Sequence, residues 1–382
     1  MDIKLSWGLG IDMVSDRSNL SPGSVVDAVN VNIDRSGGVG RRDGRELLLS
    51  VAGAHDAWTS PARGDSFAIV GGALCKITVP WSVTPLYTLA QDLPFSYCDL
   101  NGDVIASSRA ELLVIKPDLS VRRLGLDKPG APGLYGYGEY GGIGVAISYL
   151  RGDEVGPLSR VAFGSTSITL PQPTESLPTG IRVYCTGDSG DLLYRNVDVP
   201  LGVTSITINP QNRGEPANHQ FMDRMIPGDM VRPWRGTLWT VRGNILCYSD
   251  DLRYEMYDPR FNYITMPHAV RLFEPVEGGI YVGGKDGIYF LRGKNPRELE
   301  VEKRGGAAPI KGTGTQIPAS IINGEEADSG QMVAVWLSGN GYVIGMPDGR
   351  IIEKQRKYIK LDDSSNTGAV VVHDRQVTAV VS

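Results

Sequence analysis

Short runs of strand-forming residues, separated by turn residues, follow one another along nearly the whole chain. The runs are rich in β-branched and aromatic residues, as at 67–70, 237–241 and 333–337. Runs of this length that are bounded by Gly, Asn, Asp or Pro predict β-strands. No stretch of three or more helical turns repeats apolar residues at the spacing of an amphipathic helix. The chain is therefore predicted to be all-β.

Many of these strands are joined by very short turns. Gly71-Gly72, Gly339-Asn340-Gly341 and Pro347-Asp348-Gly349 are examples. Their residues tolerate the positive φ values that tight hairpin turns need. Hairpins are therefore predicted to be the building units of the fold.

A longer unit repeats above the hairpins. It consists of an apolar strand, a glycine turn, a second strand and a polar-ended third strand, and it occupies residues 64–89, 95–124, 232–258, 269–300 and 331–356. Residues 368–381 are half a unit. One such sheet cannot bury both its faces alone, so copies must pack around an axis. We predict a β-propeller of about five to six blades, in which an N-terminal strand at 47–51 joins the half unit and closes the ring.

The repeat is interrupted between residues 129 and 212. Strands at spacings of 10–15 residues around Gly-Asp turns favour a small β-sandwich of the fibronectin type III kind, inserted between blades. The alternative is two ordinary blades with long loops. The chain is divided into an N-terminal arm that carries the ring-closing strand (1–60), a first propeller part (61–128), the inserted sandwich (129–212) and a second propeller part (213–382).

The residues offer little that points to catalysis or metal binding. The four cysteines, Cys75, Cys98, Cys185 and Cys247, form no C-x-x-C pair and lie among strand residues, so buried reduced thiols are expected. The four histidines are widely spaced and form no zinc motif. The acidic turn at 99–103 could hold calcium, but a hairpin turn at Asn101-Gly102 explains it more simply. We predict no enzymatic activity, no cofactor and no metal.

Charge and length exclude further classes. Lys+Arg 38 against Asp+Glu 43 leaves a net charge of -5, which argues against a generic basic coat for nucleic acid. No apolar run is long enough for a transmembrane helix, and the N-terminus is not expected to be a secretion signal. Residues 351–360 alternate charged and apolar residues and are predicted to be a half-exposed strand.

Two local features are candidate contact sites. Arg41, Arg42 and Arg45 lie in a glycine-rich segment and could contact phosphates, although such a cluster is also found in solvated turns and protein contacts. The aromatic-rich stretch 233–263 is ranked first as an interface, second as core and third as a ligand-stacking surface.

Three features together resemble the tail hub, or nozzle, proteins of short-tailed bacteriophages. They are the N-terminal segment 25–48, the propeller split by a sandwich at 129–212, and the blade sequence at 278–296. In the first, the matching positions are Asn30, Asp34, Gly38, Arg41, Arg42 and Gly44. The resemblance spans most of the chain, and its motifs consist of turn residues.

The resemblance implies a structural virion protein without enzymatic activity. Six copies would form a ring that extends the DNA channel, retains the packaged double-stranded genome and releases it on infection. Partners would be the head-to-tail adaptor, portal-associated proteins and tail fibre or needle proteins, without membrane insertion. The protein would be made in the host cytoplasm and end in the virion tail. The chain is shorter than many members, so a peripheral domain for fibre attachment is expected to be reduced or missing.

The alternative is a monomeric carbohydrate-binding or glycan-active β-propeller. A ring subunit needs two complementary surface patches, so that head-to-tail contacts between copies produce a closed ring. A glycan-binding protein needs one concave site with convergent polar groups.

Overall fold

The computed structural model describes residues 10–28, 31–33, 39–41, 50–135, 142–187, 190–321, 330–353, 355–361, 367–373 and 376–381. These residues contain no α-helix, and three short 3-10 helices, Arg17–Asn19, Pro296–Glu298 and Ala319–Ile321, interrupt an otherwise all-β chain. The all-β prediction is confirmed. In the described part of the chain, no helix has the length and apolar character to cross a membrane.

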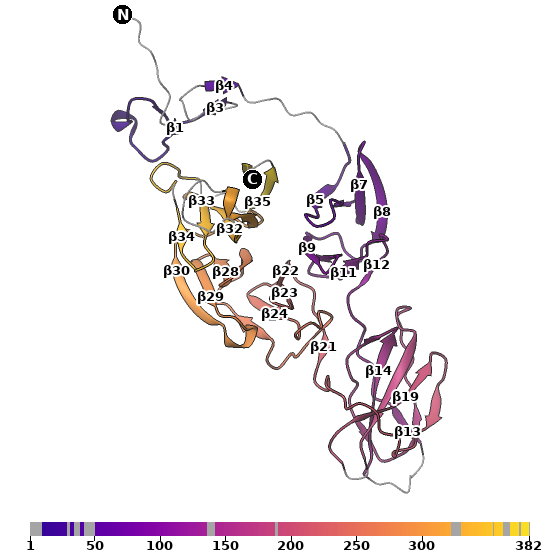
Figure 1. The fold of residues 1–382 in the computed structure, drawn as a ribbon. Helices are drawn as coiled ribbons and strands as arrows, with labels where there is room; N and C mark the ends of the chain where they lie inside the picture. The colour runs from indigo at the N-terminus through magenta and orange to yellow at the C-terminus, as the bar shows by residue number, and fades with distance from the viewer. Residues whose placement is uncertain are drawn as a thin grey trace, which may run out of the picture.

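Five antiparallel sheets of four strands are the blades of a propeller (Figure 1). Blade 1 is β5 (Ala54–Thr59), β6 (Ser66–Val70), β7 (Ala73–Thr78) and β8 (Ser82–Thr88); blade 2 is β9 (Ser96–Leu100), β10 (Asp103–Ser107), β11 (Leu112–Ile115) and β12 (Val121–Arg123). Blade 3 is β22 (Met230–Trp234), β23 (Thr237–Arg242), β24 (Ile245–Tyr248) and β26 (Tyr263–Thr265). Blade 4 is β27 (Leu272–Val276), β28 (Gly279–Gly284), β29 (Gly287–Arg292) and β30 (Glu300–Gly305); blade 5 is β31 (Thr315–Pro318), β32 (Met332–Ser338), β33 (Gly341–Gly345) and β34 (Ile351–Ile352). In each blade the strands pair in chain order.

The blades pack face to face through apolar side chains. One buried cluster joins blades 1 and 2 around Phe67 and Leu113, and another joins blades 2 and 3 around Val114 and Leu238. Further clusters join blades 3 and 4, and blades 4 and 5. Apolar packing between neighbouring sheets therefore holds the ring together, as the sequence predicted.

The two ends of the chain form smaller sheets. β35 (Gly368–His373) and β36 (Gln376–Val381) make a two-stranded hairpin beside blade 5. Near the N-terminus, β1 (Gly10–Ile11) pairs with β2 (Ser24–Val25), and β3 (Val31–Ile33) pairs with β4 (Val39–Arg41). The ring thus has five complete blades and one two-stranded sheet, which confirms the predicted propeller of about five to six blades.

A β-sandwich is inserted between blades 2 and 3 and projects from the ring (Figure 1). One sheet is β13 (Gly133–Tyr135), β17 (Ser167–Thr169) and β20 (Ser205–Thr207); the other is β14 (Gly144–Arg151), β15 (Glu154–Val155), β16 (Ala162–Phe163), β18 (Gly180–Cys185) and β19 (Tyr194–Pro200). Its core includes Ile147, Ile168 and Val183, all 0% exposed. The predicted insertion is confirmed, and the alternative of two ordinary blades is wrong.

Three local predictions need correction or lie outside the described residues. Blade 1 begins at Ala54, inside the predicted arm 1–60. The sequence did not indicate this strand, because β5 carries polar residues and lacks an apolar run. Within 351–360 the strand ends at Ile352, and a turn follows at residues 355–358. Of the ring-closing strand expected at 47–51, residues 47–49 lie outside the described residues, and Ser50 and Val51 belong to no strand.

Candidate functional site

A cluster of charged side chains lies where the sandwich meets the ring, and we call it the joint. It is built from the end of blade 2, the two chain segments that connect the ring with the sandwich, and the 171–178 loop of the sandwich. The connecting segments are residues 124–128 and 223–225, the latter including β21 (Asp223–Arg224), which pairs with β25 (Met256–Tyr257). Leu126, 0% exposed, belongs to the sandwich core, so the first segment is anchored by apolar packing.

Arg224 is the central cation of the joint. Its Nε donates to the Leu124 carbonyl at 2.8 Å, and its Nη1 lies 2.7 Å from Asp127 Oδ1 and 3.3 Å from Glu175 Oε1. Arg123 of β12 pairs with the same Glu175 oxygen. One carboxylate of the sandwich loop therefore binds an arginine from the end of blade 2 and an arginine from the second connecting segment, which fixes the loop against the ring.

A second set of charges continues the joint. Arg122 Nη1 lies 3.7 Å from Glu154 Oε2, which also pairs with Arg151, and Lys128 Nζ lies 2.6 Å from Asp223 Oδ1. Burial raises the pKa of the Glu154 carboxyl despite the arginines around it. Such partly buried, shared ion pairs contribute more to orientation than to stability.

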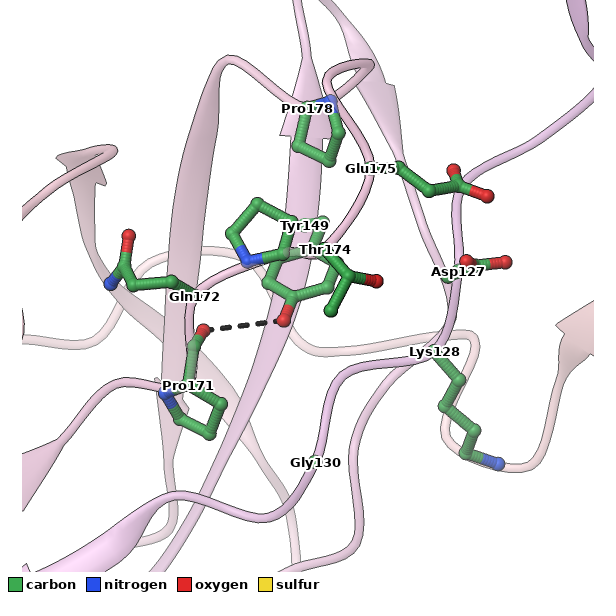
Figure 2. A pocket seen from close by; sticks show the side chains of 10 residues that line it. Asp127, Lys128, Gly130, Tyr149, Pro171, Gln172, Thr174, Glu175 and Pro178 are labelled. Atoms are coloured by element: carbon green, nitrogen blue, oxygen red, sulfur yellow. Dashed lines mark hydrogen bonds between the residues drawn. The ribbon is translucent and has the colours of Figure 1, made fainter.

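A cavity of about 450 Å³ lies within the joint (Figure 2). Its lining comes from the first connection, from β14 and from the proline-rich loop, and consists of Asp127, Lys128, Gly130, Tyr149, Pro171, Gln172, Pro173, Thr174, Glu175 and Pro178. An aromatic ring, an amide and carboxylates around one cavity are groups that could contact a sugar.

Most of these polar groups are already bonded within the protein. The Tyr149 hydroxyl donates to the Pro171 carbonyl at 3.2 Å, as the dashed line in Figure 2 marks. The Gln172 amide donates to the carbonyls of Leu170 and Val203 and accepts from the Gly202 N–H. Asp127 and Glu175 are held by arginines. The cavity is therefore lined by groups that hold the joint together.

The predicted arginine contact site is only partly described. Arg41 ends β4 and is exposed. Arg42 and Arg45 lie outside the described residues. Contact of these arginines with DNA or with a neighbouring subunit stays a prediction.

The histidines and cysteines do not come together. His55 lies between two carboxylates, with Nδ1 2.7 Å from Asp56 and Nε2 2.9 Å from Asp92. His219 is buried in the sandwich, 3.1 Å from the Ser148 hydroxyl, and burial lowers its pKa to about 4. The four cysteines are buried and free, as predicted. Among the described residues, no group of His, Cys, Asp and Glu is arranged to hold a metal.

The aromatic stretch 233–263 divides between core and surface. Trp234, Trp239 and Tyr248 are buried between blades 3 and 4. Phe261 is 66% exposed, and the Arg260 guanidinium lies 5.1 Å from its ring and 3.9 Å from that of Phe221. The stretch therefore supplies core first and leaves a smaller exposed aromatic and arginine surface.

The joint was not found from the sequence. Arg123, Glu175 and Arg224 are separated by about fifty residues each, and no local pattern relates charges across such distances. The one usable signal was the proline-rich loop around Glu175, whose prolines mark a chain held without regular structure.

The whole chain has only distant likenesses among known proteins. No protein-family model matches it, and no match was found among curated proteins. Among solved structures, KlHsv2 with loop 6CD replaced by a Gly-Ser linker is 9% identical over 86% of this chain and 89% of that one, at a TM-score of 0.35. Virginiamycin B lyase from Staphylococcus aureus is 12% identical over 88% and 94%, at 0.36. BBS1N in complex with ARL6DN is 10% identical over 87% and 90%, at 0.34. These likenesses are too weak to carry an argument, and the propeller assignment rests on the sheets themselves.

Proposed function

We propose that this protein is a structural subunit of a ring-shaped tail hub, or nozzle, of a short-tailed bacteriophage. Six copies would surround a channel, retain the packaged DNA and release it on infection, with adaptor and fibre proteins on the outer surface. The joint carries this proposal among the structural observations. The sandwich projects from the ring, and shared ion pairs hold it where the chain leaves the ring and where it returns. This arrangement suits a protein whose role is mechanical.

Two further observations support the proposal. The sequence resembles such proteins in its N-terminal segment, its split propeller and the blade at 278–296. The N-terminal residues 10–28 lie outside the ring (Figure 1), and their only buried side chain among the described ones is Asp12. An extended segment without a core of its own is typical of chains that dock on a neighbour.

The glycan-binding alternative is less well supported. The joint cavity has the residue types of a sugar site, but its amide, phenol and carboxylates are bonded within the protein. A ligand would have to replace those bonds, and leaving their partners unpaired costs about 1–3 kcal/mol each.

The mass of the purified protein in solution, followed by negative-stain imaging and a glycan-binding screen, tests the proposal. A particle of about six times the 41.3 kDa chain mass, with an axial hole and no glycan binding, is expected. Assembly is measured both alone and with virion adaptor proteins. A monomer under both conditions that binds a glycan would contradict the hub and favour the alternative.

A further inference from the structure

The outer strand of blade 3 has a free edge. Among the described strands, β26 pairs only with β24. The Asn262 carbonyl accepts from β24 at 3.1 Å at one end of this ladder, and the Met266 N–H donates to the Asn244 carbonyl at 2.8 Å at the other. Alternate residues of an antiparallel strand bond to the same neighbour. The backbone groups of Tyr263 and Thr265 therefore point away from β24, and both residues are exposed.

This edge lacks the features that usually keep an outer strand from pairing further. Edge strands are protected by proline, by charged side chains or by being very short. In the other blades, β8 contains a proline, β12 and β30 carry charged side chains, and β34 has two residues. β26 has the sequence Tyr-Ile-Thr, and its ladder extends over residues 262–266. The free edge of β26 is therefore a place where a further strand can add.

Exposed apolar side chains lie beside the free edge. Ile245 is opposite Thr265 in the ladder, so Ile245, Tyr263 and Thr265 face the same side of the sheet. Ile245 is 39% and Tyr263 48% exposed. Phe261, two residues before Tyr263, is 66% exposed. A strand with one apolar face would therefore find apolar contacts here as well as backbone partners.

A segment of this kind is present at the N-terminus of the same chain. Residues 3–7 have the sequence Ile-Lys-Leu-Ser-Trp, in which apolar and polar residues alternate. Strict alternation over this length predicts a strand with one apolar face, and tryptophan is among the residues that contribute most to interfaces. Residues 1–9 lie outside the described residues. We propose that residues 3–7 of one copy add as a strand to the free edge of β26 in a neighbouring copy.

The attachment of the N-terminal segment favours a neighbouring copy over the same chain. The Met13 N–H donates to the Tyr358 carbonyl at 2.7 Å, and Tyr358 follows the outer strand of blade 5. Trp7 and Met13 are six residues apart in the sequence, a length that spans about 20 Å when extended. Blade 4 lies between blade 5 and blade 3, and Figure 1 shows β1 on the opposite side of the ring from β24. Residues 3–7 are therefore held away from β26 of their own chain.

The contact rests on the proposed function, because it assumes that copies of this chain assemble. The segment that adds and the strand that receives it are different surfaces of the molecule. A head-to-tail contact of this kind repeats from copy to copy until a ring closes. Main-chain hydrogen bonds would supply affinity, and the alternating apolar side chains would supply specificity.

Paired cysteines test the contact in the full chain. Thr265→Cys is combined with Leu5→Cys or with Ser6→Cys, because successive residues of a strand face opposite sides. On mild oxidation, one of the two pairs should link copies into covalent oligomers on a non-reducing gel. The matched control replaces Thr265→Cys by Thr84→Cys, an exposed threonine in the outer strand β8, and should stay unlinked. A link within one chain, found by peptide mass in the monomer band, or no link from either pair would overturn the proposal.

Two pairs of variants test the same contact without cysteines. Thr265→Pro removes an N–H that points outwards and no bond within the blade, whereas Thr265→Val keeps that N–H. Thr265→Pro should lower the association constant between copies about tenfold, the factor equivalent to one lost hydrogen bond. Leu5→Asp, on the apolar face, should lower it at least as much, and Ser6→Asp should not. Sedimentation equilibrium measures the constants, and equal effects within either pair would refute the contact.

The outcomes separate this contact from the tail-hub proposal. A ring that forms equally well with Thr265→Pro and without cross-links refutes the contact and leaves the hub proposal standing. Cross-linked copies in open chains, with no ring on imaging, support the contact and contradict the hub. Absence of both rings and cross-links refutes the contact.

Discussion

A single buried ion pair links three blades of the ring. Arg232 of β22 donates to Glu274 of β27 from Nη2 at 2.8 Å and from Nε at 3.1 Å, and its Nη1 contacts Ser96 and Tyr97 of blade 2. Glu274 is 2% exposed. The buried Glu274 carboxylate neutralises the charge of the Arg232 guanidinium, which lies among three sheets.

Glu274→Gln should therefore destabilise the ring strongly. The change leaves Arg232 without its counter-charge, and breaking a buried pair from one side costs about 3 kcal/mol or more. Urea unfolding followed by tryptophan fluorescence, with Trp234 and Trp239 in blade 3, measures the loss. Asp348→Asn, in a pair with both side chains more than half exposed, is the control and should cost less than about 1 kcal/mol. Equal losses would show that burial of the pair is unimportant.

His219 predicts a dependence of stability on pH. Its folded pKa of about 4 lies below the ordinary 6.5, because burial disfavours the charged ring. Between pH 6.5 and 4 the unfolded chain therefore binds a proton that the folded chain does not, so the free energy of unfolding decreases as the pH is lowered through this range. This group should cost about 3 kcal/mol by pH 4, and His219→Gln should remove that part of the slope.

His55 provides the opposite sign. Burial alone would lower its pKa, but hydrogen bonds to Asp92 and Asp56 raise it above the ordinary value. Its contribution to stability is present below pH 6.5 and is lost as the pH rises through the folded pKa. Urea midpoints of wild type, His219→Gln and His55→Gln are compared across pH 4–8. The same direction of change in both variants would contradict these assignments.

At the scale of elements, blades 2 and 3 are neighbours although the sandwich separates them in the chain. Ser107, at the end of β10, donates to the Gly228 carbonyl at 2.8 Å and accepts from the Gly228 N–H at 3.0 Å. Gly228 also has no room for a side chain, because a Cβ there would lie 2.5 Å from the Val241 carbonyl. At this point blades 2 and 3 meet through backbone groups and one hydroxyl, in addition to the apolar cluster around Val114 and Leu238.

Ser107→Ala should weaken this contact. Both Gly228 groups would be buried without a partner, at a cost of about 1–3 kcal/mol. The free energy of unfolding from urea titration measures the effect. The control Ser167→Ala removes a hydroxyl contact to Thr207 on the sandwich surface and should change stability by less than about 0.5 kcal/mol. A loss no larger than that of the control would mean that water replaces Ser107.

The elements predicted from the sequence are those with local signals. Asn101 and Gly102 have φ values of 50° and 83°, as the hairpin turn in that position requires. Apolar central strands such as β23 and β28 were found because both their faces are buried. β5 was missed because its residues are mostly polar and only partly buried. The joint was missed because Arg123, Glu175 and Arg224 are far apart in the sequence and come together only in the folded structure.

At the scale of the whole molecule, the ring and the sandwich have separate cores. The clusters of the sandwich include no residue of a blade, and those of the ring include no residue of the sandwich strands. The joint connects them through ion pairs that are partly exposed, each worth about 1 kcal/mol or less. The joint therefore fixes the orientation of the sandwich on the ring, but it couples the unfolding of the two parts only weakly.

Two unfolding transitions are expected in calorimetry of the full chain. Val183→Ala in the sandwich and Val282→Ala in blade 4 remove equal groups from sites 0% and 1% exposed, at about 2 kcal/mol each. Val183→Ala should lower only the transition of the sandwich, by about 10 °C, and Val282→Ala only that of the larger ring, by about 5 °C, since the shift per kcal/mol falls with size. If both variants lowered one common transition, the joint would couple the two bodies in folding as well as in orientation, and its ion pairs would have to be worth several kcal/mol together.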